Sequence, residues 1–178
     1  MPALAAKLAY MDASLSHVKN GVYGAMFFCA FISAAFTEKD INKCFQTALS
    51  FIPAKSRFYE EALKAREIAF TSATREELIQ RLVTNGKRYN WVHTLNNAAI
   101  CIGAVMYSQN DFADAVSIAV ECGYDTDCNG ATVGSFMGAL LGESGIPEYL
   151  KVPIKDTFSV GISPYDNYSI KQFAKECM

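Results

Sequence analysis

Hydrophobic residues recur along most of the chain at the three- and four-residue spacing of an amphipathic α-helix. Prolines, Asn-Gly pairs and Ser, Thr or Asp residues suited to N-cap positions interrupt the periodic stretches. No segment alternates convincingly in the manner of a β-strand, no repeat is visible and no linker divides the chain. The pattern therefore predicts a single all-α domain over residues 1–178. Its expected helices run from the N-terminus to 17 or 18, then over 22–36, 41–52, 56–70, 74–84, 96–107 and 112–119, from about 129, and over 168–177.

Two of the predicted helices have strongly apolar surfaces. In the first, Leu4, Leu8, Met11 and Leu15 fall on one face. In the second, GVYGAMFFCAFISAAF at residues 21–36, apolar residues occupy all sides. Its 16 residues are short for a bilayer, which needs about 20. We therefore expect the central helix of a large core rather than a membrane span.

Composition and charge narrow the class of protein further. Of the 178 residues, 51% are hydrophobic and 19% are charged, as in a globular domain with a deep core. The net charge of −2, without a basic stripe, argues against a nucleic-acid partner. The six cysteines form no C-x-x-C pair, and the N-terminus lacks a basic-then-apolar signal pattern. We expect a reducing, cytoplasmic setting and no membrane association.

The stretch GYDTDCNGATVGSFMGALLG, residues 123–142, combines two aspartates with a glycine at every fourth position. Glycine inside a helix costs about 1 kcal/mol relative to alanine, so the series requires a compensating contact. Residues four apart share a helix face, and these glycines therefore leave a bare groove. We expect the buried helix 22–36 to approach closely along this groove. Dimerisation in a membrane, the other use of such a series, is disfavoured by the acids before it and the polar tail after it.

Asp125 and Asp127, which precede the glycine series, are candidate ligands for a hard cation, because such cations bind oxygen. On an α-helix, residues two apart point about 200° away from each other, so the carboxylates converge only in a turn or an extended segment. The alternative is that Asp127 caps the helix and Asp125 is solvated. The spacing alone leaves both open. An EF-hand loop is excluded, because Phe136 occupies its twelfth position, where a bidentate glutamate is required.

Four segments, in this order along the chain, carry a resemblance to a known family. They are S-L-S-H-V-K-N-G-V-Y-G-A (14–25), W-V-H-T-L-N-N-A-A (91–99), G-Y-D-T-D (123–127) with its small-residue helix, and I-P-E-Y-L-K-V-P-I-K-D (146–156). They are similar to four motifs of the ADP-ribosylglycohydrolase family. The first resembles a Ser/Thr-His before a Gly-x-x-Gly-Ala turn, and the second the approach to the metal motif. The third resembles the metal motif itself, and the fourth the segment after it, with Tyr149 where tryptophan is common. The resemblance covers essentially the whole chain.

The resemblance implies a compact all-α domain of orthogonal helices. It also implies an enzyme that uses a pair of magnesium ions (Mg²⁺) to hydrolyse an ADP-ribosyl bond to an arginine or serine side chain, or to a related acceptor. By position in the motifs, Asp125 and Asp127 would be metal ligands. The residues implied to bind ADP-ribose are His17, Gly21, Tyr23 and Gly24.

The start of the second helix suits this role, because free backbone N–H groups and the positive end of a helix dipole favour a diphosphate. From the residues alone, a tight interhelical turn also explains Gly21 and Gly24. A helix-end histidine bonded to the backbone likewise explains His17. Three further residues are expected to cap and pin a loop rather than touch substrate: His93, Asn96 and Asn97.

Two departures from the family's pattern bear on activity. Cys128 follows the second aspartate, where the family usually has a threonine whose oxygen joins the metal shell. A neutral thiol is a poor ligand for Mg²⁺. The family's N-terminal Thr-Asp-Asp cluster is absent from the sequence, and the acid pairs 60–61 and 76–77 are interpreted as solvated helix faces. We therefore expect the C-terminal portion of the family's domain, with catalytic residues partly in a missing N-terminal segment.

Three explanations stay open for such a chain: a fragment, half of a split enzyme, or an inactive relic. An apolar face left uncovered by missing helices would favour self-association. The function predicted first is Mg²⁺-dependent removal of ADP-ribose from a modified protein side chain or a small ADP-ribosyl substrate, with this chain alone at most partly competent. The alternative is a non-catalytic module that keeps the fold and binds ADP-ribose or serves structurally.

Overall fold

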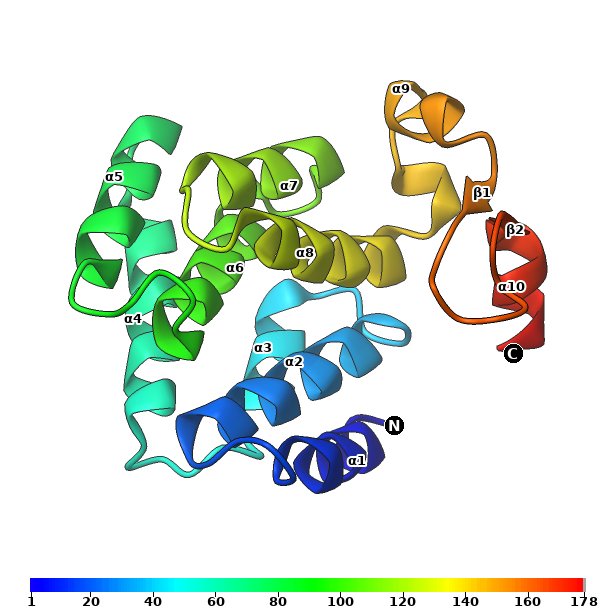
Figure 1. Cartoon of the computed structure of the whole chain (residues 1–178). Coiled ribbons are helices and arrows are strands. Elements are labelled where there is room, and N and C mark those ends of the chain that lie inside the picture. Colours follow the sequence, from blue (N-terminus) through cyan, green and yellow to red (C-terminus); the bar gives the residue numbers. More distant parts are fainter. Residues whose placement is uncertain (178) are drawn as a thin grey trace.

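The structure, a computed structural model, describes residues 1–177 and is mostly helical within them (Figure 1). The α-helices are α1 (Pro2–Ala13), α2 (Asn20–Ala35), α3 (Ile41–Leu49), α4 (Arg57–Thr71), α5 (Arg75–Gly86), α6 (Thr94–Ser108), α7 (Phe112–Glu121), α8 (Thr126–Leu141), α9 (Glu148–Lys151) and α10 (Ile170–Glu176). The remaining elements are two 3-10 turns, η1 (Glu143–Gly145) and η2 (Val152–Ile154), and two short strands, β1 (Thr157–Phe158) and β2 (Tyr168–Ser169). The predicted all-α class is confirmed.

Polar caps set several helix starts where the sequence places them. At the starts of α3, α4, α5 and α7, a side-chain oxygen accepts a hydrogen bond from a backbone N–H of the first turn. Each cap satisfies a donor that has no partner inside the helix. The four capping residues are Asp40, Ser56, Thr74 and Asp111.

The core is centred on α2 and α6, with α8 packed against both. Phe31 of α2 stacks on Phe136 of α8 with ring centroids 3.8 Å apart. Phe27 of α2 lies 5.7 Å from Phe45 of α3 and 5.5 Å from Phe58 of α4, again between ring centroids. The apolar run at 21–36 is therefore the central helix that the sequence predicts. Within residues 1–177, no helix has both the length and the apolarity to cross a membrane.

The first helix ends at Ala13, earlier than predicted, and packs on α2 through alanines rather than through its large apolar residues. Small side chains allow two helix backbones to approach closely at interior packing density. The stripe of large residues at 4, 8, 11 and 15 is exposed instead. Beside this stripe, α1 and α2 border a groove of about 380 Å³. An exposed apolar face thus lies on α1, and its covering by missing helices stays a prediction.

The glycine-rich helix α8 begins at Thr126, three residues before its predicted start, and its glycine face lies toward α7. A Cβ built at Gly130 would meet Val120 of α7 at 3.3 Å, whereas one at Gly138 would meet nothing within 4 Å. The predicted close approach of α2 along the glycines is therefore wrong. Helix α2 contacts the opposite, bulky face of α8 instead, through the ring of Phe136.

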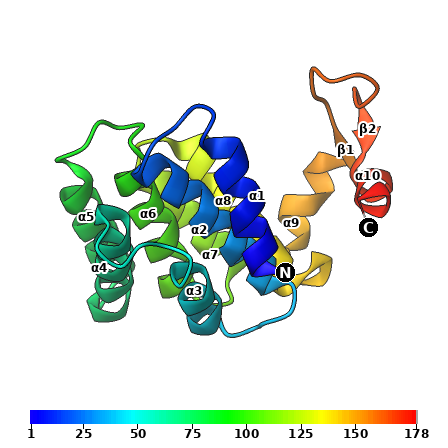
Figure 2. The same cartoon turned by 90° about the horizontal axis from the view of Figure 1, so that it is seen from below.

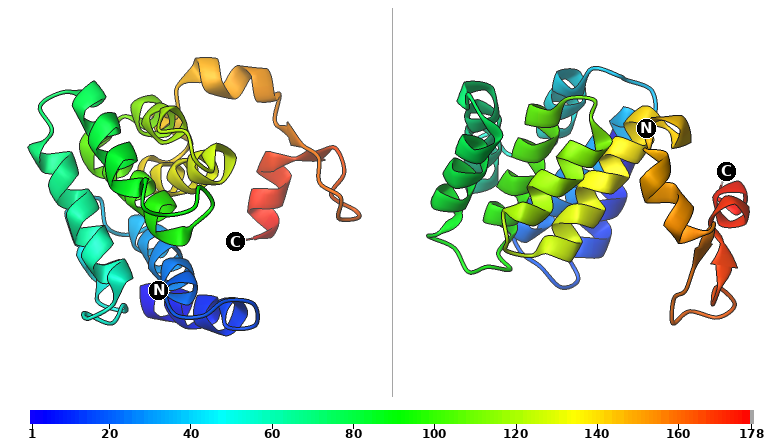
Figure 3. Two further views of the ribbon diagram at one scale, coloured as in Figure 1. Left: turned by 60° about the vertical axis from the view of Figure 1, so that its left-hand side comes forward. Right: turned by 90° about the horizontal axis from the view of Figure 1, so that it is seen from above.

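Residues 143–177 leave the helical body and form a small unit of their own (Figures 1 and 3). Strands β1 and β2 pair antiparallel, with Thr157 opposite Ser169. Four aromatic rings cluster at this pair. Phe158 and Tyr165 each contact Phe173 with ring centroids 5.4 Å apart, and Tyr168 lies 5.3 Å from Tyr165. The prediction of no strands is wrong here. Two residues per strand are too few to produce an alternating pattern in the sequence.

Candidate functional site

Three potential metal ligands converge at the start of α8. Asp125 occupies the N-cap position with φ −87° and ψ 69°, outside the helix, while Asp127 and Cys128 lie in its first turn. One ligand atom from each of the three residues lies within 4.8 Å of the others. The aspartates converge because only one of them is helical, whereas two helical residues at this spacing diverge. The alternative in which Asp127 caps α8 is therefore wrong, and Asp125 makes no side-chain capping bond.

A left-handed turn leads into this cluster. Gly123 has φ +80° and Tyr124 has φ +42°, a conformation that is easy for glycine and costly for tyrosine. The Tyr124 hydroxyl donates to the Val83 carbonyl at 3.0 Å. Gly86 makes room for this contact, since a Cβ there would lie 3.0 Å from the Tyr124 hydroxyl oxygen. The C-terminal end of α5 thus anchors the turn that carries Asp125.

Asn97 of α6 fixes the backbone at the candidate ligands. Its Oδ1 accepts hydrogen bonds from the N–H of Asp125 at 3.3 Å and from Nδ2 of Asn129 at 2.8 Å. Its Nδ2 donates to the carbonyls of Trp91 at 2.8 Å and His93 at 3.1 Å. The predicted pinning of the loop by Asn97 is confirmed. Its second role, at the turn that carries Asp125, is not predictable from the sequence. The sequence shows only an amide side chain inside an otherwise apolar helix.

The loop between α5 and α6 is held at its end by the two other predicted residues. Nδ1 of His93 accepts a hydrogen bond from the N–H of Leu95 at 3.1 Å and so caps α6. Nδ2 of Asn96 donates to the carbonyl of Asn90 at 3.1 Å. Both residues therefore act on the loop as predicted.

A buried carboxylate, Glu61 of α4, holds the same loop from the other side. It accepts hydrogen bonds from Asn85 at 2.9 Å and from the Tyr89 hydroxyl at 3.3 Å, and it pairs with the Arg88 guanidinium. Burial, with the Glu61 charge as the smaller cause, raises the pKa of Tyr89. The Tyr89 ring stacks on His93 with centroids 4.8 Å apart. The interpretation of residues 60–61 as a solvated face is thus wrong for Glu61, which is only 8% exposed.

The residues predicted to bind ADP-ribose lie at the turn into α2. His17 is exposed, and its Nδ1 lies 2.7 Å from the hydroxyl oxygen of Ser16. A Cβ built at Gly21 would come within 3.0 Å of the His17 side chain, so glycine lets the imidazole lie against the first turn of α2. The alternative of an imidazole bonded to the backbone is therefore wrong, because the Ser16 hydroxyl is the partner of the His17 ring. Tyr23 is partly buried and packs against the core.

Neither glycine makes the turn itself, because both lie inside α2 and the left-handed residue is Lys19, with φ +48°. Gly24 serves packing: a Cβ there would lie 2.5 Å from Cγ2 of Thr94 in α6. The N–H groups of Gly21 and Tyr23 donate to preceding carbonyls at 3.2 and 2.9 Å. These two N–H groups are therefore not free for a diphosphate, contrary to expectation.

The N-terminal end of α6 connects the two groups of candidate residues. Thr94 contacts α2 at Gly24, and Asn97, three residues later, bonds to Asp125. The turn before α2, the loop before α6 and the turn before α8 reach one edge of the helical body (Figures 2 and 3). The predicted substrate and metal residues thus share one edge of the molecule, although they lie about a hundred residues apart in the chain.

Cys128 differs from the cysteines of the core. All six cysteines are free, and burial raises the pKa of Cys44, Cys101 and Cys122. Cys128 is exposed, and its hydrogen bond to the Asp125 carboxylate is the main cause that raises the pKa of its thiol.

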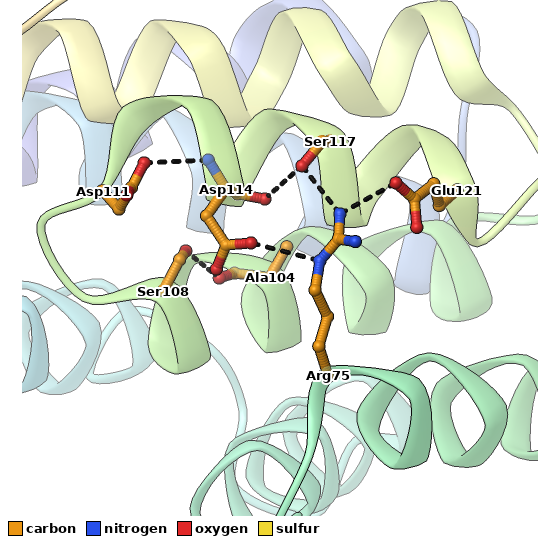
Figure 4. A network of polar contacts seen from close by, with 7 residues as sticks. All are labelled: Arg75, Ala104, Ser108, Asp111, Asp114, Ser117 and Glu121. Atoms are coloured by element: carbon orange, nitrogen blue, oxygen red, sulfur yellow. Dashed lines mark hydrogen bonds and ion pairs between the residues drawn. The ribbon is translucent and has the colours of Figure 1, made fainter.

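An arginine clasp positions α7, the helix that covers the glycine face of α8 (Figure 4). Arg75 at the start of α5 pairs with Asp114 at 3.1 Å and with Glu121 at 2.9 Å. Its guanidinium also donates to the hydroxyl of Ser117 at 2.7 Å. Because all three partners are on α7, the clasp sets how α5 and α7 meet, and it stands outside the candidate ligand cluster.

The donor set at the start of α8 fits a divalent cation only in part. Two carboxylates supply the oxygens that Mg²⁺ prefers, whereas the Cys128 sulfur suits softer ions. Fold and site together define an all-α protein with a candidate divalent-metal centre at a helix start.

The comparison with family models identifies the class more closely. The model of the ADP-ribosylglycohydrolase family matches residues 1–176, and the chain belongs to this family. Members are hydrolases that act on ADP-ribosylated substrates and are generally metal-dependent. Neither the curated proteins nor the solved structures gave a match.

Proposed function

We propose that this chain contributes to the metal-dependent hydrolysis of an ADP-ribosyl bond, on a modified protein side chain or a small ADP-ribosyl compound. The observation that carries the proposal is the convergence of Asp125 and Asp127 at the start of α8, on a backbone held by Asn97. Asp125 and Asp127 would hold the cation, and Mg²⁺ is the ion that the resemblance to the family implies.

The bound cation would supply Lewis-acid polarisation and orientation for substrate and water. His17, at the same edge, is exposed and carries its imidazole on the first turn of α2, where it would hydrogen-bond ADP-ribose. Gly21 and Gly24 would act indirectly, by keeping His17 and Thr94 close to α2. Tyr23 would form part of the pocket wall.

Two carboxylates are fewer anionic oxygens than a tightly held hard cation usually has. Water, substrate oxygens or carboxylates of another polypeptide segment would complete the shell.

Calorimetric titration of the chain with ADP-ribose, with and without Mg²⁺, tests this proposal. We expect binding that requires the cation and is lost in Asp127→Asn, because the substitution removes an anionic ligand while leaving the side-chain volume nearly unchanged. Asp166→Asn, which removes a charge from an exposed position in the C-terminal unit, should bind like the parent. Cation-independent binding that Asp127→Asn leaves intact would overturn the metal assignment.

A non-catalytic ADP-ribose-binding module is the second candidate, because Cys128 stands where the family's motif has threonine. Metal-dependent binding of ADP-ribose without release from an ADP-ribosylated peptide would favour this alternative. Release of free ADP-ribose, measured by chromatography, would favour the hydrolase.

A further inference from the structure

We infer that the centre at the start of α8 binds a borderline divalent cation, such as Zn²⁺ or Co²⁺, in preference to Mg²⁺, through the sulfur of Cys128. The inference rests on the proposed metal site but concerns which ion occupies it. Three observations carry it: the exposed position of Cys128, its distance from the two carboxylates, and the hydrogen bonds that hold the backbone of the turn.

Cys128 is in the ligand cluster and is accessible. Its sulfur lies within 4.8 Å of a carboxylate oxygen of both Asp125 and Asp127. Its exposure and the closeness of its sulfur to both carboxylates place the thiol at the cluster rather than in the core. Cys101, by contrast, is buried beside Asn129, with its sulfur 3.5 Å from the amide oxygen, and is enclosed by protein.

The spacing suits a small tetrahedral ion after modest side-chain rotation. With bonds of about 2.3 Å to sulfur and about 2.0 Å to carboxylate oxygen, ligand atoms of tetrahedral zinc lie roughly 3.5 Å apart. The present spread of up to 4.8 Å therefore has to contract by about 1 Å. Because Asp127 and Cys128 are exposed, rotation about their side-chain bonds can supply this movement.

The backbone of the turn is already fixed for such a site. The N–H of Asn129 donates to the Asp125 carbonyl at 2.9 Å and closes the first turn of α8 across all three ligands. Asn97 bonds to both ends of this turn. Three protein ligands leave one tetrahedral position open, as in catalytic zinc sites.

Ligand chemistry then decides between the cations. Mg²⁺ requires near-octahedral oxygen coordination and gains little from sulfur, whereas thiolate favours zinc and similar ions. When the ion binds, a lone pair of the Cys128 sulfur forms the metal bond and the thiol proton leaves to the solvent. No oxidant or reductant is involved.

Titration of the full chain with Co²⁺, followed by absorption and by calorimetry, tests this inference. We expect a near-ultraviolet charge-transfer band from thiolate to cobalt, which Zn²⁺ abolishes at equal concentration and a hundredfold excess of Mg²⁺ does not. Cys128→Ser should remove the band and weaken Co²⁺ binding at least about tenfold, the scale on which metal sites respond to loss of a supporting group. Cys177→Ser, at another exposed cysteine, should leave both unchanged.

The outcomes separate this inference from the proposed function. A band that survives in Cys128→Ser, or displacement of Co²⁺ by an equal concentration of Mg²⁺, would overturn the inference. If ADP-ribose binding still required Mg²⁺ and Asp127 in that case, the proposed function would stand alone. If neither Mg²⁺ nor Co²⁺ bound to the chain, both would fail.

Discussion

At the scale of single residues, the candidate site depends as much on side chains that hold backbone as on the ligands. Asn97 bonds to the Asp125 N–H, and Tyr124 keeps a left-handed conformation through its bond to Val83. Such supporting groups orient metal ligands, and their loss typically reduces metal affinity 10–100-fold. Sequence patterns identified Asp125 and Asp127 as candidate metal ligands, because a carboxylate indicates this role by its residue type alone.

Asn97→Ala should weaken Co²⁺ binding by about 10–100-fold, because the ligand turn loses its tie to α6. The free energy of unfolding should fall by about 1–3 kcal/mol, since the buried Asn129 amide loses its partner. Asn97→Asp, which keeps the acceptor oxygen, should retain more of the affinity. Calorimetry and urea denaturation measure the two effects.

The exposed Asn110→Ala serves as the control for this series. Unchanged Co²⁺ affinity in a folded Asn97→Ala variant would show that Asn97 does not position the ligands.

At the scale of helices, glycine has different roles in α2 and α8. Gly24 allows α2 and α6 to meet, because the methyl group of Thr94 occupies the space of its missing side chain. Gly138 faces open space. The sequence shows the regular glycine series in α8 and suggests packing there, yet of these two glycines it is Gly24, outside that series, that has the closer contact.

Gly24→Ala should lower the free energy of unfolding by about 1–3 kcal/mol, as overpacking of a core does. Gly138→Ala should raise it by up to about 1 kcal/mol, because alanine favours a helix where no neighbour obstructs it. Thr94→Ser, which removes the obstructing methyl group, should recover part of the loss in Gly24→Ala. Urea denaturation of Gly24→Ala, Gly138→Ala and the double variant Gly24→Ala/Thr94→Ser checks this pattern. Equal effects of the two alanine substitutions would contradict the packing described for α2 and α6.

At the scale of the whole molecule, an apolar stripe is exposed on α1 and the turn after it, with Phe36 beside it. The exposed fractions are 44, 56, 57 and 87% for residues 4, 8, 11 and 15, and 68% for Phe36. Clusters of large exposed apolar side chains of this kind tend to mark interaction surfaces. Leu4, Leu8 and Met11 lie on α1, and Leu15 lies in the turn that follows its last residue, Ala13.

Self-association through α1 is therefore expected, as the sequence also suggested. Leu8→Glu should shift the chain toward monomer, because it places a charge in the middle of the stripe. Leu63→Glu, at another exposed leucine on α4, should leave the association unchanged. Light scattering over a tenfold range of concentration tests this. A parent chain that is monomeric throughout the range would contradict the prediction.

Short-range chemistry in the chain was sufficient for several features of this protein. The 3.6-residue period places most helices, and Asp40, Ser56, Thr74 and Asp111 cap four of them close to their predicted starts. The motifs indicate the family and give Asp125 and Asp127 as candidate metal ligands. Each of these depends on neighbours within one or two helical turns. Over that range, separation along the sequence fixes which residues lie close together.

Contacts between distant segments could not be predicted from these sequence patterns, because they depend on which surfaces fit together after the helices have formed. Packing turned the alanines of α1 inward and its leucines outward, directed the glycines of α8 toward α7, and buried Glu61. It also placed Asn97 between the loop before α6 and the turn before α8. The residue types of the candidate site can thus be read along the chain, while their convergence at one edge depends on volume and hydrogen-bond partners supplied by other helices.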